Sequence, residues 1–160
     1  MEKNMLVELI ERVFHTIKRI LKENDEKVDV KKTYYASGAL KEEIPYVNGE
    51  EHGVKKKYYE SGALEWEISY VNGKIHGIWK RYYESGVLLS ETPYVNDKEH
   101  GVSKWYYVSG ALRRETPYVN DKIHGVDKYY SESGELLRTT EYKNNKIVNV
   151  HNGRKIVELM

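Results

Sequence analysis

The sequence predicts a mainly β fold: an elongated antiparallel β-hairpin meander with one amphipathic α-helix at its N-terminus. Three observations predict this fold. A 24-residue period runs through most of the 160 residues, two turn signals recur in each period, and the segments between the turns are rich in Tyr, Val, Ile and Thr. We expect five repeats of two strands each, joined side by side into one sheet of about ten strands.

The repeat is defined by a shared pattern of residue types. It reads Tyr-Tyr-x-Ser-Gly-x-Leu, a Glu three residues after the Leu, then Tyr-Val-Asn-Gly and His-Gly. So many positions recur at one interval that the period is structural. The positions expected to maintain the frame of the sheet include Tyr58, Gly62, Leu64, Tyr70, Gly77, Tyr82, Gly86, Leu88, Tyr94 and Gly101.

Each repeat holds two turn signals. The first is Ser-Gly, as in Ser61-Gly62, and the second is Asn-Gly, as in Asn48-Gly49, which becomes Asn-Asp or Asn-Asn in later repeats. Both central residues of a type I′ turn need positive φ, which Gly, Asn and Asp tolerate best. The two signals therefore predict two-residue hairpin turns.

Proline interrupts the second strand in three repeats, at Pro45, Pro93 and Pro117. Because proline cannot donate to a hydrogen-bond ladder, we expect that strand to bulge there or to pair on only one side. The glycine after each repeat His predicts a further bulge, or the close approach of a Tyr ring to bare backbone.

The two ends of the chain differ from the repeats. Apolar residues recur at helical spacing between Leu6 and Leu21, which predicts an amphipathic helix within 1–24 that caps an end or a face of the sheet. We expect a polar connection over 25–32, the repeat array over 33–147, and a C-terminal capping hairpin over 148–160 around Asn152-Gly153.

The Tyr-Tyr-x-Ser-Gly-x-Leu and Tyr-x-Asn-Gly-x-x-His-Gly elements resemble the bacterial variant of the MORN repeat, over residues 32–147. The resemblance implies an elongated array of β-hairpins. In bacteria, similar proteins are often labelled antitoxin or immunity components of toxin–antitoxin systems, while other MORN proteins act as scaffolds or contact lipids. The last unit departs from the pattern, with Ser131 in place of the second Tyr and Thr139 in place of the Glu.

Composition excludes several kinds of function. Lys and Arg number 26 against 25 Asp and Glu, which argues against nucleic acid or an anionic membrane as the main partner. There is no cysteine, so thiolate chemistry and disulfides are excluded. No secretion signal, spanning apolar run or catalytic motif is present, so we expect a cytoplasmic protein that is not an enzyme and holds no cofactor or metal.

Several chemically active residue types recur once in each repeat. Equivalent histidines should lie about 9–10 Å apart, two strands away from each other, so one metal ion could not bridge them and a role in the turn is expected. These are His52, His76, His100 and His124. Glu and Lys recur at positions that predict a cross-strand charge ladder, with a charged binding stripe as the alternative. They are Glu43, Glu67, Glu91 and Glu115, and Lys56, Lys80, Lys104 and Lys128.

Three sets of equivalent positions vary while the frame repeats. They are Lys55, Trp79, Ser103 and Asp127; Lys57, Arg81, Trp105 and Tyr129; and Glu42, Trp66, Ser90 and Arg114. Since Trp and Arg are common anchors of protein interfaces, we expect partner contact at Trp66, Trp79, Arg81 and Trp105, with unconstrained surface as the alternative.

The expected function is a non-catalytic protein-binding module, most specifically an antitoxin or immunity protein that neutralises a partner toxin. The alternative is a structural or membrane-associated scaffold that binds anionic lipid head groups through the Tyr and Lys ladders. For the N-terminal helix, a cap on the sheet is favoured over a membrane-surface role because its basic and acidic residues nearly balance. Self-association of the helix is a third reading.

Overall fold

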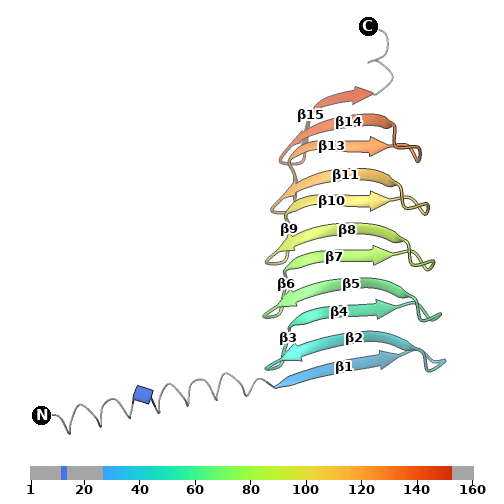
Figure 1. Cartoon of the computed structure of the whole chain (residues 1–160). Helices are drawn as coiled ribbons and strands as arrows, with labels where there is room; N and C mark the ends of the chain where they lie inside the picture. The colour runs from blue at the N-terminus through green and yellow to red at the C-terminus, as the bar shows by residue number, and fades with distance from the viewer. Residues whose placement is uncertain (1–11, 14–26, 153–160) are drawn as a thin grey trace, which may run out of the picture.

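The computed structural model describes residues 12–13 and 27–152 and consists of one antiparallel sheet in which hairpins follow one another along its length (Figure 1). The continuous path through the sheet is β1-β2-β4-β5-β7-β8-β10-β11-β13-β14-β15. Four two-residue strands pair beside this path. The mainly β meander is therefore confirmed, while the helix predicted within 1–24 lies, apart from residues 12–13, outside the described residues.

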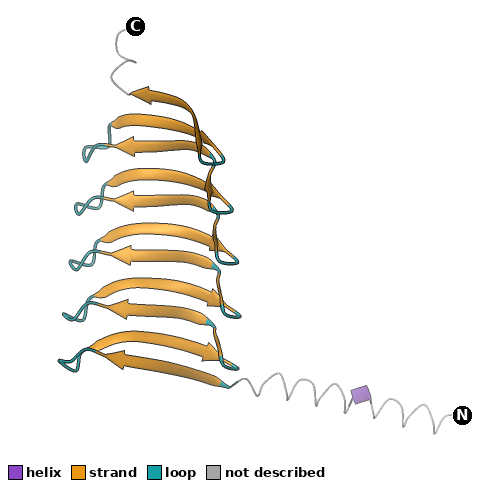
Figure 2. Cartoon of the chain, turned by 180° about the vertical axis from the view of Figure 1, so that it is seen from behind, coloured by secondary structure: helices purple, strands orange, loops and turns teal. Residues whose placement is uncertain are grey.

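The long strands are β1 (Val28–Tyr34), β2 (Leu40–Val47), β4 (Gly53–Tyr58), β5 (Leu64–Val71), β7 (Gly77–Tyr82), β8 (Leu88–Val95), β10 (Gly101–Tyr106), β11 (Leu112–Val119), β13 (Gly125–Tyr130), β14 (Leu136–Lys143) and β15 (Lys146–Asn152). The short strands are β3 (Glu50–Glu51), β6 (Lys74–Ile75), β9 (Lys98–Glu99) and β12 (Lys122–Ile123). Across the described residues the sheet is a single layer, with neither a helix nor a second sheet against it (Figure 2).

The Asn turns have the geometry that the sequence predicts. Asn48 and Gly49 have φ of 53° and 86°, and Asn96 and Asp97 have φ of 49° and 67°. Positive φ at both central residues is the mark of a type I′ turn, whose twist matches that of the flanking strands. This prediction is confirmed in every repeat.

The Ser-Gly turns differ from the prediction of a two-residue hairpin. In the first repeat the loop runs from Tyr35 to Ala39, where the Tyr35 amide donates to the Ala39 carbonyl at 2.9 Å and the Gly38 amide donates back to the Tyr35 carbonyl at 3.0 Å. Only the glycine of the pair, Gly38, has positive φ, at 88°. The Ser-Gly pair thus closes a five-residue loop, because one left-handed residue after an ordinary turn is sufficient to reverse the chain.

The strand opposite the proline accommodates it. Between the pairs Tyr46↔Glu51 and Glu43↔Lys56, four residues of the return strand, 52–55, face only two of β2, 44–45. Pro45 still contributes its carbonyl, which accepts from the His52 amide at 3.0 Å. The strand opposite the proline therefore carries the bulge.

The glycine after each His lies against the proline. A Cβ on Gly101 would lie 3.0 Å from Pro93 Cγ, and one on Gly77 would lie 3.1 Å from Cβ of Ser69, which takes the place of proline in that repeat. The predicted close approach to bare backbone exists, but the side chain that approaches is proline or serine and not a tyrosine ring.

Strands continue beyond both predicted boundaries of the array. The connection predicted over 25–32 contains most of β1, in which Val28 pairs with Val47 and Lys32 with Glu43. The first hairpin needs this strand as the partner of β2, and the alternation of Val28 and Val30 was its signal. At the other end β15 starts at Lys146 and pairs with β14, so residues 148–152 extend the sheet, and residues 153–160 of the predicted hairpin lie outside the described residues.

The two edges of the sheet cover part of their own hydrogen-bonding groups. On β1 the Val30 amide donates to the side chain of Asp29 at 2.8 Å. On β15 the Val150 amide donates to the side chain of Asn149 at 2.9 Å. An edge amide that is already bonded to its neighbour is not available to a second strand, which reduces edge-to-edge association.

Reciprocal hydrogen bonds from the Asn turns join consecutive repeats. The Asp97 amide donates to the Ile75 carbonyl at 2.9 Å, and the Ile75 amide donates back to Asp97 Oδ1 at 2.8 Å. Gly73 occupies the place of Asp97 one repeat earlier and makes only the first of these bonds, to the Glu51 carbonyl at 2.9 Å.

We expect Gly73→Asp to raise the free energy of unfolding by about 0.5–1.5 kcal/mol. The new carboxylate would accept from the Glu51 amide, and Gly73 has a φ of 72° that Asp97, at 67°, already adopts. A Cβ at Gly73 meets no atom within 4 Å. Gly49→Asp is the control, because the Lys27 amide in that repeat already donates to the Asn48 side chain at 3.2 Å. Equal effects of the two substitutions in urea unfolding would contradict the expectation.

Candidate protein-binding face

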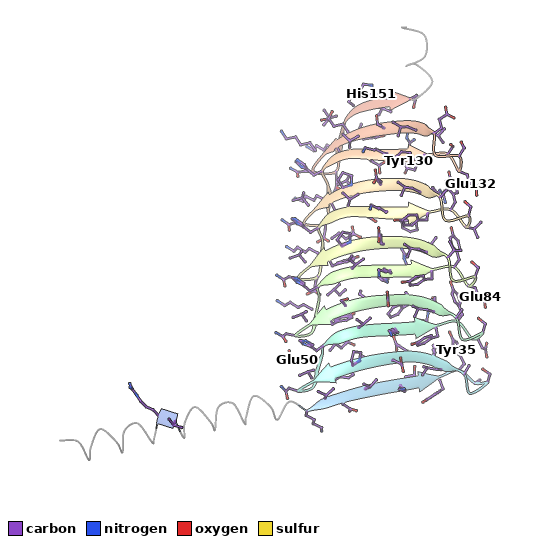
Figure 3. The ribbon with its side chains drawn as sticks, in the orientation of Figure 1. Tyr35, Glu50, Glu84, Tyr130, Glu132 and His151 are labelled. Carbon is purple, nitrogen blue, oxygen red and sulfur yellow. The ribbon has the colours of Figure 1, made fainter. Side chains whose placement is uncertain are left out.

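The two faces of the sheet carry different residues. On the ladder face Lys and Glu alternate from strand to strand, as in Glu67↔Lys80 and Lys80↔Glu91. The opposite face, here called the variable face, contains the row Lys57, Trp66, Arg81, Ser90, Trp105, Arg114, Tyr129 and Arg138, one residue per long strand from β4 to β14. Figure 3 shows side chains along the whole stack of strands.

The ladder face is a charge ladder, as the sequence predicts. Ammonium and carboxylate groups lie 3.5 Å apart in Lys80–Glu67 and in Lys104–Glu91, and 3.6 Å apart in Lys128–Glu115. A tyrosine hydroxyl completes each site: those of Tyr58, Tyr82, Tyr106 and Tyr130 donate to Glu43, Glu67, Glu91 and Glu115. Hydrogen bonds from Lys32 and then Tyr58 lower the pKa of Glu43. The recurring charges on this face therefore stabilise the sheet.

The second tyrosine of each pair joins one repeat to the next. The Tyr59 hydroxyl donates to the Tyr82 carbonyl at 2.9 Å, and the Tyr83 hydroxyl donates to the Tyr106 carbonyl at 3.0 Å. Ser131 replaces this residue in the last unit, and its hydroxyl bonds within its own loop, to Ser133 and to the Glu135 amide. These bonds tie consecutive repeats together and so stabilise the array.

Three tyrosines predict a loss of stability in alkali. Burial, with a hydrogen bond to a glutamate, raises the pKa of Tyr82 and of Tyr106 to about 12, and burial beside Glu99 does the same for Tyr94. An unfolded tyrosine titrates near 10.0. Between pH 10 and 12 the unfolded chain loses protons that the folded chain keeps, so the free energy of unfolding falls as the pH rises through this range.

We expect urea unfolding to show this decline between pH 10 and 12. Because these tyrosines are only partly buried and solvent screens the charge of the phenolate, the decline amounts to about 1 kcal/mol or less for each tyrosine. Tyr82→Phe/Tyr106→Phe should flatten the pH dependence, since Phe has no proton to lose. An unchanged slope in this double variant would count against the assignment.

The most buried row of the sheet lies on the variable face. Its buried residues are apolar near the N-terminal end, at Ile44 and Ile68. Toward the C-terminal end the buried residues are polar: Thr92, Ser103, Thr116, Asp127 and Thr140. Asp127 is 0% exposed and Ser103 3% exposed, so these two members of a predicted variable set cannot contact a partner. They vary because each is matched to its neighbours, which is a correction to the sequence interpretation of that set.

Asp127 illustrates the matching. Its Oδ1 accepts from Arg114 Nε at 2.8 Å and from Thr116 Oγ1 at 2.7 Å. One repeat earlier, Ser103 Oγ lies 2.8 Å from Thr92 Oγ1 at the equivalent place. A carboxylate and a hydroxyl thus fill the same slot, each with its own hydrogen-bond partners.

Arginine and aromatic side chains stack on one another along the variable face. The Arg81 guanidinium lies 4.7 Å from the ring centroid of Trp105 and 5.1 Å from that of Trp79. Arg114 and Arg138 lie 4.6 Å and 4.4 Å from the ring centroid of Tyr129. Cation–π contact of this kind fixes the plane of each guanidinium while its N–H groups remain able to bond outward.

The structure brings together the four residues predicted to contact a partner. Trp66, Arg81 and Trp105 lie in the same row, and Trp79 lies beside them against Tyr94, with ring centroids 6.1 Å apart. The Trp79 indole nitrogen is buried without a hydrogen-bond partner among the described residues. The indole nitrogen of Trp79 is therefore not free to bond to a partner.

Three arginine and aromatic members of the row, Arg114, Tyr129 and Arg138, are not among the residues that the sequence predicts to contact a partner. Arg114 and Tyr129 belong to the variable sets, and Arg138 follows Arg114 at the repeat interval. The signal that could have found them is the alternation of arginine and aromatic residues at equivalent positions. It becomes visible once the register places those positions on neighbouring strands.

The repeat histidines lie at the bulges. The His52 amide donates to the Pro45 carbonyl, and its ring Nδ1 lies 3.2 Å from Asn72 Oδ1 in the turn of the next repeat. His124 has the same relation to Asn144, also at 3.2 Å. These contacts agree with the predicted turn role. Within residues 12–13 and 27–152 no group of three or more His, Asp or Glu side chains is arranged to hold a metal ion.

A shallow hollow of about 330 Å³ lies on the ladder face. The hollow is lined by the apolar residues Ile78, Pro93 and Val102 and by the charged residues Glu91, Lys104 and Glu115. Both carboxylates already accept from tyrosine hydroxyls and pair with lysines. The charged groups of the hollow thus belong to the ladder.

Together, the single sheet, the constant ladder face and the variable face define a β-hairpin repeat protein. The family model for the MORN repeat variant matches residues 30–48, 51–72, 75–96, 99–120 and 123–144, which is more than half of the chain. The chain therefore belongs to the MORN repeat variant family, with five repeats. Among curated proteins, none matches the chain. In the described part of the chain no helix is long and apolar enough to cross a membrane.

Proposed function

We propose that this MORN repeat protein is a non-catalytic protein-binding module whose variable face contacts the partner. The observation that carries the proposal is the segregation of residue types: Lys, Glu and Tyr recur in nearly every repeat on the ladder face, whereas Trp, Arg, Ser and Tyr follow one another in one row of the other. Trp, Tyr and Arg supply most of the binding energy in protein interfaces. Trp66, Arg81 and Trp105 vary at partly exposed positions, unlike the buried Ser103 and Asp127.

The alternative role, a scaffold on anionic lipid head groups, has less support. It requires an excess of positive charge on the Tyr and Lys ladders. Each of Lys80, Lys104 and Lys128 lies opposite a glutamate within 3.6 Å, so the ladder face has little net charge to offer.

The finer proposal is that the partner is a toxin and that the chain is its antitoxin or immunity protein, acting in the cytoplasm. Its support is the resemblance of the repeats to those of bacterial antitoxin and immunity components. A flat sheet of this length is suited to covering the active surface of another protein. The test is co-expression: the captured partner should arrest growth alone, and the chain should relieve the arrest, in cells whose fractionation places the chain in the cytoplasm.

The binding role of the variable face is tested by affinity capture of the full chain from its native cells, followed by binding measurements with the purified partner. Trp66→Ser inserts the residue that Ser90 provides at the same place in the next repeat, so the fold should tolerate it. We expect Trp66→Ser and Trp105→Ala each to weaken binding about 30-fold or more, as for interface anchors worth 2 kcal/mol.

Lys80→Ala and Val102→Ala, on the ladder face, are the matched controls and should leave the affinity unchanged. A loss of binding confined to the controls would place the interface on the ladder face. Co-purifying lipid, with binding to anionic vesicles that salt weakens, would favour the scaffold instead.

A further inference from the structure

The charges of the variable face are unequally distributed along the sheet. In its N-terminal part the cations have acidic neighbours: Lys57 lies 3.0 Å from Glu65, and Lys55 lies 3.5 Å from Glu42 and from Glu51. From β7 to β14 the row contains Arg81, Arg114 and Arg138. The C-terminal part of the row is therefore basic, although the chain as a whole has a net charge of only +1.

Only one of these three arginines has an ion-pair partner among the described residues. Arg114 pairs with the buried Asp127 at 2.8 Å. Arg81 Nε donates to a neutral group, Ser90 Oγ, at 3.0 Å, and no carboxylate within residues 27–152 lies in ion-pair distance of Arg81 or Arg138. Two positive charges on one row thus have no ion-pair partner within the described sheet.

Stacking holds these cations in place. Tyr129 lies between Arg114 and Arg138 in the register, with both guanidiniums within 4.6 Å of its ring centroid. The Arg81 guanidinium contacts the rings of both Trp79 and Trp105. A guanidinium fixed in plane presents its N–H fork to a carboxylate with little further loss of entropy. Two like charges on one ring are also stabilised when an anion binds beside them.

The register sets the spacing of the three arginines. Arg81 and Arg114 are three strands apart, with Ser90 and Trp105 between them, and Arg114 and Arg138 are two strands apart. At about 4.8 Å per strand these separations are about 14 Å and 10 Å. An extended polypeptide rises about 3.3 Å per residue, so they correspond to about four and three residues.

We propose that the row Arg81–Trp105–Arg114–Tyr129–Arg138, here called the Arg–aromatic row, binds an extended acidic segment of a protein partner. The segment runs along the sheet, across the strands. Its carboxylates lie on Arg81, Arg114 and Arg138 with separations of about four and three residues, and its intervening residues lie on Trp105 and Tyr129. This inference rests on the proposed function and specifies the partner chemistry of the same face.

A protein segment fits the row better than single-stranded nucleic acid does. Nucleic acid carries a phosphate at every nucleotide and is held by a clear basic excess, while this chain is nearly neutral. Three cations separated by aromatic rings match a segment with intermittent charge.

The test is a titration of the full chain with synthetic peptides, followed by its own tryptophan fluorescence. The three tryptophans of the chain, Trp66, Trp79 and Trp105, all lie on the variable face, so their emission reports on the site. The probe is a Gly/Ser peptide with three Glu residues at positions i, i+4 and i+7. Comparison peptides carry Gln in place of Glu, or the same Glu residues next to one another, and a thymidine oligonucleotide serves as the nucleic-acid probe.

Two variants and one control isolate the row. Arg138→Ser inserts the residue that Ser90 provides at the equivalent place, and Arg81→Tyr inserts the one that Tyr129 provides. Lys104→Ser removes the same charge from the ladder face. We expect each arginine variant to weaken binding of the spaced peptide about 10-fold, and Lys104→Ser to leave it nearly unchanged. The Gln peptide should bind at least about 10-fold more weakly than the Glu peptide.

The proposal is overturned if the Glu and Gln peptides bind equally, if clustered Glu binds as well as spaced Glu, if the oligonucleotide binds more tightly than any peptide, or if Lys104→Ser is as harmful as the arginine variants. These outcomes are separate from the proposed function. Suppose that a native partner no longer binds Trp66→Ser but still binds Arg138→Ser and Arg81→Tyr. This result would support the protein-binding role of the variable face and contradict the binding of an acidic segment.

Discussion

Arg114→Ser is expected to lower the free energy of unfolding by about 3 kcal/mol, because it leaves the carboxylate of Asp127 buried without a cation. Asp127 is 0% exposed, and Arg114 Nε donates to its Oδ1 at 2.8 Å. The remaining partner is the hydroxyl of Thr116, since Asp127 Oδ2 has no partner among the described residues. A single neutral hydrogen bond does not replace the lost ion pair.

Asp127→Ser should cost much less. Arg114 keeps contact with solvent, with 30% of its side chain exposed, and it remains stacked on Tyr129. The two single substitutions should lower the free energy of unfolding by different amounts because the carboxylate is buried and the guanidinium is partly exposed.

The double variant Arg114→Ser/Asp127→Ser should recover most of the loss. It reproduces what the preceding repeat already contains, where Ser90 and Ser103 stand at these places and Ser103 Oγ lies 2.8 Å from Thr92 Oγ1. Urea unfolding of the four proteins gives the coupling energy directly. A double variant no more stable than Arg114→Ser would refute the idea that the two residues are matched.

Gly101→Ala should be the most harmful of the glycine substitutions, with a loss of about 2–6 kcal/mol in the free energy of unfolding. Two effects combine. The φ of Gly101 is 115°, which an L-residue rarely adopts, and the added Cβ would lie 3.0 Å from Pro93 Cγ. The proline ring is covalently fixed to the backbone, so it cannot turn away.

Gly110→Ala provides the matched control. Gly110 also has positive φ, 85°, but an added Cβ would meet only Val87 Cγ1, at 4.0 Å. Its cost should be about 1–2 kcal/mol, from the backbone alone. Placing Gly101→Ala in a Pro93→Ala background should remove the contact contribution and leave the conformational one. If Gly101→Ala and Gly110→Ala cost the same, the packing of glycine on proline has no energetic weight.

The repeated residues allowed much of the fold to be predicted. Asn48-Gly49 and Asn96-Asp97 need no distant contact to form a type I′ turn, because their preference for positive φ is local. The ladder was predictable for a related reason: residues that recur at one interval in a hairpin array meet on neighbouring strands, as Lys80 does with Glu67 and Glu91. The variable positions could be identified from the sequence because the frame around them is constant.

The sequence alone did not predict which residues lie side by side on each face of the sheet. Four residues, 52–55, oppose two, 44–45, and the register shifts again between Lys57 and Tyr58, so the cross-strand partners could not be assigned from the alternation of residues alone. The Ser-Gly loop and the strand over Val28–Tyr34 also differed from the sequence prediction. The Arg–aromatic row appears only when Arg114, Tyr129 and Arg138 are placed on successive strands by this register.

The sequence by itself determined the period, the Asn turns and the partners within the ladder, because each depends on residues close in the chain or on exact repetition. The tertiary structure alone decided which variable positions are buried. In a single-layer sheet a side chain is covered only by its cross-strand neighbours, and these come from different repeats with different residues. Asp127 is buried and Arg81 is partly exposed for this reason, although both occupy positions that vary equally in the sequence.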